Sequence, residues 1–107
     1  MNLLTTVKGN PLSFAVYHEV DGAIYGLAYG EKYSLNISRS LSENAPCIAV
    51  KSSNETFTVD TNNLKCGTYC FEIGLVSSAG VETIISPATD INGNILNRLI
   101  ITERIGN

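Results

Sequence analysis

The stretch Leu64–Ser77, LKCGTYCFEIGLVS, decides the fold expected for this chain. It opens with a turn over residues 64–68. Apolar residues then occupy every second position: Tyr69, Phe71, Ile73 and Leu75. A period of two over this length is typical of a β-strand with one row of side chains against a core and the other toward solvent or a partner. We therefore predict the central strand of an antiparallel β domain here.

Shorter stretches on both sides of this strand show similar alternation between turn-rich segments. In one of them, 32–39, the serines Ser34 and Ser38 are expected to point outward. The last stretch alternates less regularly, which predicts burial on both faces or a bulge. We expect further strands over residues 3–7, 11–20, 32–39, 47–51, 55–59, 81–86 and 95–105.

About seven or eight short strands and no amphipathic helix indicate an all-β fold, a two-sheet antiparallel β-sandwich, with a small barrel as the alternative. The chain has 107 residues and 44% hydrophobic content, which suits one domain over residues 1–107 with a single core. Its formal net charge of −3 gives no basic field for phosphates, so we expect no nucleic acid partner.

The N-terminal residues 1–9 lack the basic start and apolar run of a secretory signal. No stretch reaches the length needed to span a membrane, so we expect no membrane insertion. The chain is expected to be made in the cytoplasm and to leave it only as part of an assembly such as a virion or tail-like particle. An odd number of cysteines, three, also favours reduced thiols.

Few residues offer chemistry. His18 is the only histidine, and no further ligands follow it at metal-binding spacing. On an extended strand Cys66 and Cys70 would lie about 13 Å apart, beyond the roughly 4.4 to 6.8 Å that a disulfide allows. No nucleophile elbow or phosphate loop is present. We therefore expect no enzyme activity, cofactor or metal; the alternative is a small enzyme or metal protein that uses His18 with Cys47, Cys66 or Cys70.

The segment 90–94, DINGN, begins like a calcium-binding loop. The pattern then fails, because Ile95 stands where glycine is needed and Ile101 where a bidentate acid is needed. We interpret the segment as an ordinary turn.

Tyr25 and Tyr29 lie in the glycine-rich segment 21–30, DGAIYGLAYG, which we expect to be a long loop. Tyrosines on such a loop suit a recognition surface, because they offer a large contact area at small entropic cost. The alternative is that both rings cover the open end of the sandwich. A binding role would make the domain a ligand-binding module for a glycan or a host protein.

The segment 59–73, VDTNNLKCGTYCFEI, resembles the DTxxLxxGxYxxxI pattern of small immunoglobulin-like domains in phage and prophage tail or baseplate proteins. The start at 5–10, TTVKGN, is similar to that of short proteins from prophage-like regions of gut bacteria. Two features depart from the family: Cys66 replaces the usual proline, and the Cys-Trp-Cys core of antibody domains is missing.

This resemblance implies an immunoglobulin-like sandwich in which the Tyr69 hydroxyl ties its strand to the preceding turn. It also implies a non-catalytic structural role in a phage or prophage particle. The expected partners are other protein subunits, copies of the same chain among them.

Overall fold

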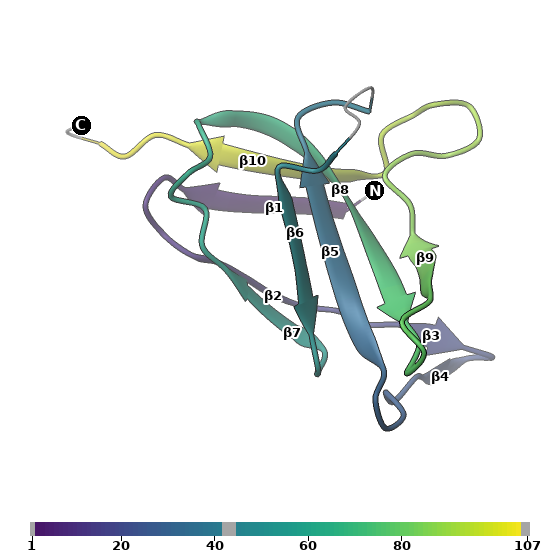
Figure 1. Ribbon diagram of the computed structural model, residues 1–107. Coiled ribbons are helices and arrows are strands. Elements are labelled where there is room, and N and C mark those ends of the chain that lie inside the picture. Colours follow the sequence, from purple (N-terminus) through teal and green to yellow (C-terminus); the bar gives the residue numbers. More distant parts are fainter. Residues whose placement is uncertain (1, 42–44, 106–107) are drawn as a thin grey trace.

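The computed structural model describes residues 2–41 and 45–105, and every regular element in this part is a β-strand (Figure 1). The all-β prediction is therefore confirmed, with more strands than expected. None of the described residues forms a helix long and apolar enough to cross a membrane. The ten strands are β1 (Asn2–Val7), β2 (Leu12–Ala15), β3 (Glu19–Val20), β4 (Ala23–Ile24), β5 (Lys32–Ser38), β6 (Ile48–Ser52), β7 (Thr56–Val59), β8 (Gly67–Val76), β9 (Glu82–Ser86) and β10 (Asn97–Thr102).

The main sheet has the order β1-β10-β8-β5-β6, so β8 is its central strand, as predicted. Cys70 of β8 pairs with Ser38 of β5 on one edge and with Arg98 of β10 on the other. β9 pairs with the second half of β8, over Ile73–Val76, on the same edge as β10. β9 and β10 thus share one edge of β8 in succession, separated by the loop that follows β9.

The prediction of a wholly antiparallel fold is wrong at one edge of this sheet. β1 pairs with β10 in parallel, from Asn2 opposite Asn97 to Val7 opposite Thr102. The two strands lie near opposite ends of the chain, and parallel pairing requires a long connection where antiparallel pairing accepts a tight turn. Here the rest of the chain is that connection, and the main sheet is mixed.

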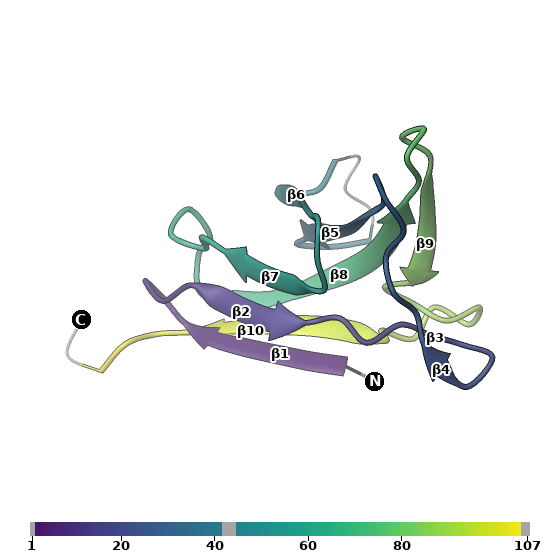
Figure 2. The ribbon, with the colours of Figure 1, turned by 90° about the horizontal axis from the view of Figure 1, so that it is seen from below.

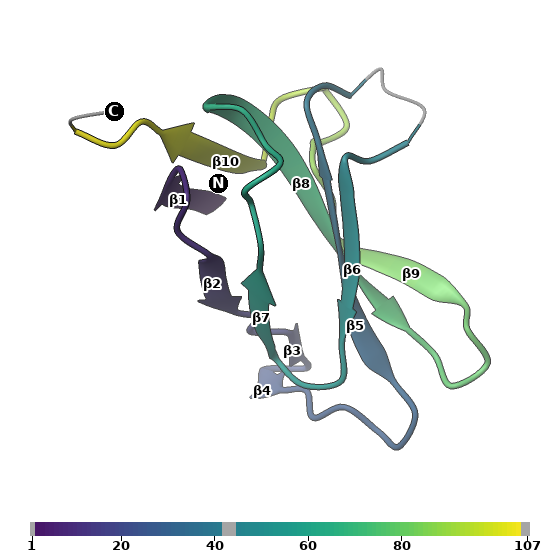
Figure 3. The same ribbon diagram turned by 60° about the vertical axis from the view of Figure 1, so that its left-hand side comes forward.

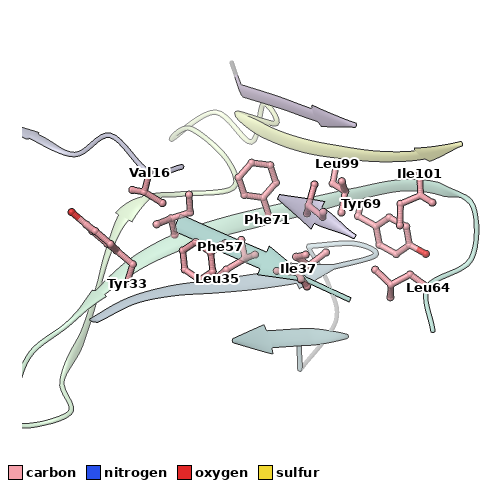
Figure 4. Packing of buried hydrophobic residues seen from close by; sticks show 13 residues of the cluster. Val16, Tyr33, Leu35, Ile37, Phe57, Leu64, Tyr69, Phe71, Leu99 and Ile101 are labelled. Carbon is pink, nitrogen blue, oxygen red and sulfur yellow. The ribbon is translucent and has the colours of Figure 1, made fainter. Parts of the chain in front are cut away.

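A second layer covers one face of the main sheet (Figures 2 and 3). It consists of β2 and β7, paired antiparallel from Leu12 opposite Val59 to Ala15 opposite Thr56. The alternating side chains of both layers meet between them, which buries their apolar rows in one core (Figure 4). The buried core residues are Leu12, Val16, Tyr33, Leu35, Ile37, Phe57, Val59, Leu64, Tyr69, Phe71, Ile73, Leu99 and Ile101.

The expected strand over 11–20 is interrupted. β2 ends at Ala15, although the Val16 amide still donates to the Glu55 carbonyl at 2.7 Å. The chain resumes as the separate two-stranded hairpin β3–β4, which lies partly in the segment predicted to be a loop. Asp21 and Gly22 link these strands with φ values of 53° and 81°. Positive φ at both central residues is the requirement of a type I′ hairpin turn, so Asp-Gly explains the hairpin.

The last strand is shorter and more regular than predicted. β10 covers Asn97–Thr102, and its buried side chains alternate as Asn97, Leu99 and Ile101, while Arg98 and Ile100 are half-buried, so the strand is not buried on both faces. Asn97 breaks the apolar pattern, but its side-chain nitrogen donates to Ser86 Oγ at 2.9 Å and to the Pro87 carbonyl at 3.0 Å. A fully buried amide at this position therefore joins the end of β9 to β10, and the expected bulge is absent from the pairs that β10 makes.

The outer face of the main sheet is also less exposed than predicted. Ser34 lies on this face as expected, yet only 2% of its surface is accessible. Its neighbour across the strands is Gly74, which is also buried. Because Gly74 has no side chain, the Glu82 side chain can lie close above it. The close approach of these three residues, which alternation alone does not reveal, removes Ser34 from solvent.

Candidate functional site

The segment 17–29 contains β3 and β4, whose ribbon extends beyond the two layers of strands (Figures 1 and 2), while Leu27 of the same segment packs against the core. We call this segment the projecting hairpin. All four residues of β3 and β4 are exposed, so neither face of this short ribbon is covered. It includes Tyr25 and Tyr29, the two residues that the sequence singled out for partner binding.

Four large apolar side chains of the projecting hairpin face solvent. Val20 and Ile24 lie on opposite faces of the ribbon, because Val20 pairs with Ala23 while Ile24 pairs with Glu19. Single exposed apolar residues are ordinary, and it is large contiguous apolar patches that mark interaction sites. The exposed fractions are 77% for Tyr17, 45% for Val20 and 68% for Ile24, and Tyr29 is fully exposed.

Tyr25 is held in place by its neighbours. Its hydroxyl donates to Glu31 Oε1 at 2.6 Å, and its ring meets the His18 ring edge to face with centroids 5.5 Å apart. The Ala28 amide donates to the same Glu31 oxygen at 2.7 Å. These two hydrogen bonds lower the pKa of Glu31, and the bond to Glu31 raises the pKa of Tyr25. Tyr25 therefore serves to order the loop.

Tyr29 differs from Tyr25 in being fully exposed. It precedes Gly30, whose φ of 82° and close approach to Ser78 fit only glycine well. The turn at Gly30 leads the chain back into β5. The structure thus separates the two tyrosines into an internal support and a free ring at the surface.

Tyr69 lies near the start of β8, which is the end of that strand far from β3 and β4 (Figure 1). Its hydroxyl donates to the Lys65 carbonyl at 2.6 Å, which links β8 to the turn before it. Nearby, Lys8 Nζ donates to the Leu64 carbonyl at 2.7 Å, and Thr61 Oγ1 donates to the Asn10 carbonyl at 3.1 Å. We call the segments 8–10 and 60–69 the tied end.

The other candidate groups do not converge. His18 packs against Tyr25, while Cys47 is exposed, Cys66 is half-buried and Cys70 is buried, and none of the cysteines is in a disulfide. Among residues 2–41 and 45–105, no cluster of three or more His, Cys, Asp or Glu side chains could hold a metal ion.

The segment 90–94 is a hydrogen-bonded turn. Asp90 Oδ1 accepts from the backbone amides of Asn92 and Asn94, both at 2.9 Å. These hydrogen bonds lower the pKa of Asp90, and the bond from the Asn94 backbone amide has the largest effect. Its carboxylate is thus occupied in closing the turn.

Comparison with known proteins finds no match to this chain among family models, curated proteins or solved structures. The class of protein must therefore be argued from its own residues and their arrangement.

Sequence reasoning missed two of the exposed apolar residues, Val20 and Ile24. Val20 was expected in the strand 11–20 and Ile24 in the loop 21–30. Neither expectation predicts the separate β3–β4 ribbon. The dipeptide Asp21-Gly22 is the signal that could have found it, since Asp-Gly between apolar residues is a strong predictor of a tight hairpin.

Proposed function

We propose that this chain is a non-catalytic assembly module that binds protein partners through the projecting hairpin. The observation that carries the proposal is the exposure of Val20 and Ile24 on opposite faces of one short ribbon. Such a ribbon can bury apolar surface on both faces when it enters a partner, which is the main favourable term in protein association. The most direct partner is a second copy of the chain.

We further propose that the fold is an immunoglobulin-like sandwich. In that fold strands C, F and G share one sheet, C′ extends it, and B pairs with E in the other sheet. The order β10-β8-β5-β6 fits G-F-C-C′, and the β2–β7 pair fits B-E. The Tyr69 bond to Lys65 has the position and direction of the tyrosine tie at the start of strand F.

A phage or prophage tail or baseplate particle is the setting that we propose for this module. Support for it comes from the sequence resemblance of residues 59–73 and 5–10. In such a particle the domain would join identical or different subunits, and the projecting hairpin would be the contact. No chemistry at His18 or at the cysteines is needed for this role.

The test is the molecular mass of the purified chain in solution, measured by size-exclusion chromatography with light scattering. We expect the unmodified chain to form a discrete oligomer and the double variant Val20→Ser/Ile24→Ser to be a monomer. Ile91→Ser is the matched control, because Ile91 is fully exposed in another loop. A chain that stays monomeric at high concentration would contradict self-assembly, and equal loss in the Ile91 variant would contradict the role of the hairpin.

The second candidate is a ligand-binding module that recognises a glycan or a host protein through the tyrosine loop. The exposure of Tyr29 favours it. Tyr29→Ala should then abolish binding on a glycan array or to host surface protein. Tyr25→Phe, which removes only the hydroxyl bonded to Glu31, should reduce binding less.

A further inference from the structure

The outer face of the main sheet, opposite the core, carries two adjoining hollows that no part of the proposed function uses. Their volumes are about 400 Å³ and 360 Å³, and Asn36 and Glu82 line both of them. Glu72 lines the first hollow, and Ser34 and Lys51 line the second. The two hollows together form what we call the outer trough.

Ser34 provides an unusual group in this trough. Ser34 is only 2% exposed, and its Oγ has no hydrogen-bond partner among residues 2–41 and 45–105. A buried hydroxyl without a partner is unfavourable for folding, and such groups in native proteins call for an explanation. A ligand that donates a hydrogen bond to Ser34 Oγ would remove this cost.

The absence of a side chain at Gly74 allows Glu82 to lie beside Ser34. A Cβ atom at this position would lie 2.5 Å from Ser34 Oγ and 2.9 Å from Glu82 Cγ. The Glu82 side chain therefore extends over Gly74, beside the hydroxyl of Ser34. Because Glu82 itself is exposed, its carboxylate can move aside to admit a ligand to Ser34.

Two of the polar side chains of the trough, those of Glu72 and Glu82, can only accept hydrogen bonds, whereas the serine and asparagine side chains both donate and accept and Lys51 donates. Glu72 and Glu82 each present a carboxylate, and the Asn36 side-chain nitrogen is already directed to Glu72 Oε1 at 3.3 Å. A set of acceptors is matched by a group that only donates, and guanidinium and ammonium groups have that property. They also form charge-assisted hydrogen bonds with carboxylates, which are stronger than neutral ones.

We propose that the outer trough binds the arginine or lysine side chain of a protein partner, with the cationic group between Glu72 and Glu82 and within reach of Ser34 Oγ. The formal net charge of −3 would favour the approach of such a basic segment. This second contact surface goes beyond the projecting hairpin. It shares with the proposed function only the premise that the domain binds protein.

The experiment is an NMR titration of the ¹⁵N-labelled chain with a blocked Gly-Ser peptide that contains one arginine. A second peptide carries citrulline, which has nearly the same shape but no charge. We expect the arginine peptide to shift the amides of Ser34, Asn36 and Gly74. The citrulline peptide should bind about tenfold more weakly, because a hydrogen bond to a charged group contributes more than a neutral one.

Variants assign the contact to specific groups. Glu72→Gln/Glu82→Gln should weaken binding of the arginine peptide about tenfold. Glu19→Gln/Glu55→Gln is the control, since it removes the same charge from exposed positions that do not line the trough. Lys51→Met should strengthen binding, because it removes a positive charge from the lining of the trough.

Ser34→Ala tests whether the hydroxyl has a binding role. It should weaken binding of the arginine peptide while the midpoint of urea unfolding stays the same or rises, because the unpartnered hydroxyl is gone. A serine that only fills space would leave binding unchanged. That result would overturn the role of Ser34.

Other outcomes would overturn the proposal as a whole. Equal binding of the two peptides, equal loss in the control variant, or shifts confined to residues outside the trough would each do so. Tighter binding of spermidine than of the arginine peptide would identify the site as one for free polyamines instead. The variant Val20→Ser/Ile24→Ser should bind the arginine peptide normally, so failure of the hairpin contact and failure of the trough are distinguishable.

Discussion

The tied end and the projecting hairpin differ in what their side chains contact. At the tied end, Lys8, Thr61 and Tyr69 each donate a hydrogen bond to a backbone carbonyl of a turn. In the projecting hairpin, Tyr29 and Ile24 face solvent. One end is thus held together by hydrogen bonds between segments, while the other exposes apolar side chains, on which the proposed partner contact depends.

The largest effect on stability is expected beneath the tied end. Ile101→Ala removes a side chain that is 1% exposed and packs in the core beside the β10–β8 pairing. Lost burial and the resulting cavity should lower the free energy of unfolding by about 2–5 kcal/mol. Chemical denaturation measures this change. Ile91→Ala, at a fully exposed position, should differ from the unmodified chain by less than about 0.5 kcal/mol.

The tie itself should have a smaller effect. Tyr69→Phe keeps the buried ring but leaves the Lys65 carbonyl without its donor. We expect a loss of about 1–2 kcal/mol in the free energy of unfolding, measured by the same denaturation. No loss would mean that water replaces the hydroxyl, and that the tied end depends on packing alone.

The projecting hairpin should hardly matter for the stability of the monomer. Ile24→Ser changes a side chain that is 68% exposed, so its effect should lie within about 0.5 kcal/mol when protein is dilute enough to be monomeric. A large loss would show that the β3–β4 ribbon packs on the two layers of strands, and it would remove the contrast between the two ends.

The smallest effect is a response of the tyrosine loop to acid. Hydrogen bonds from Tyr25 and Ala28 lower the pKa of Glu31 below its ordinary value of 4.5. The stabilisation is therefore present above that ordinary value and is lost as pH falls through the lowered pKa of the folded chain. The amide shift of Ala28, followed by NMR into acid, should report this titration. The shift should not titrate in Glu31→Gln, and a titration that persists would assign it to another group.

Local pattern was sufficient for several parts of the fold. Alternation alone predicted that Tyr69, Phe71 and Ile73 of the central strand face the core, because a strand's side chains must alternate in direction. The turn at Asp60 also follows from local chemistry, since its carboxylate accepts from the Asn62 amide at 2.9 Å. Such features depend on residues close together in the chain.

The candidate sites were less predictable. Composition marked Tyr25 and Tyr29 as equivalent, and the contacts of Tyr25 with Glu31 and His18 distinguish them. The outer trough could not be predicted from the sequence, because Ser34 and Glu82 lie far apart in the chain. Their side chains come together beside Gly74. Whether a polar residue is exposed depends on what the neighbouring strands place beside it.

The amino-acid sequence was sufficient to predict that the chain is built of β-strands and which residues of β8 form the inner row, but not the hairpin turn at Asp21-Gly22. Contacts between distant segments set the parallel pairing of β1 with β10, the burial of Asn97 and the position of the β3–β4 ribbon beyond the two layers. The two groups of features differ in how far apart in the chain the interacting residues lie. Alternation and turn chemistry act between neighbouring residues, whereas strand order and burial depend on contacts between distant segments, whose energies no local pattern records.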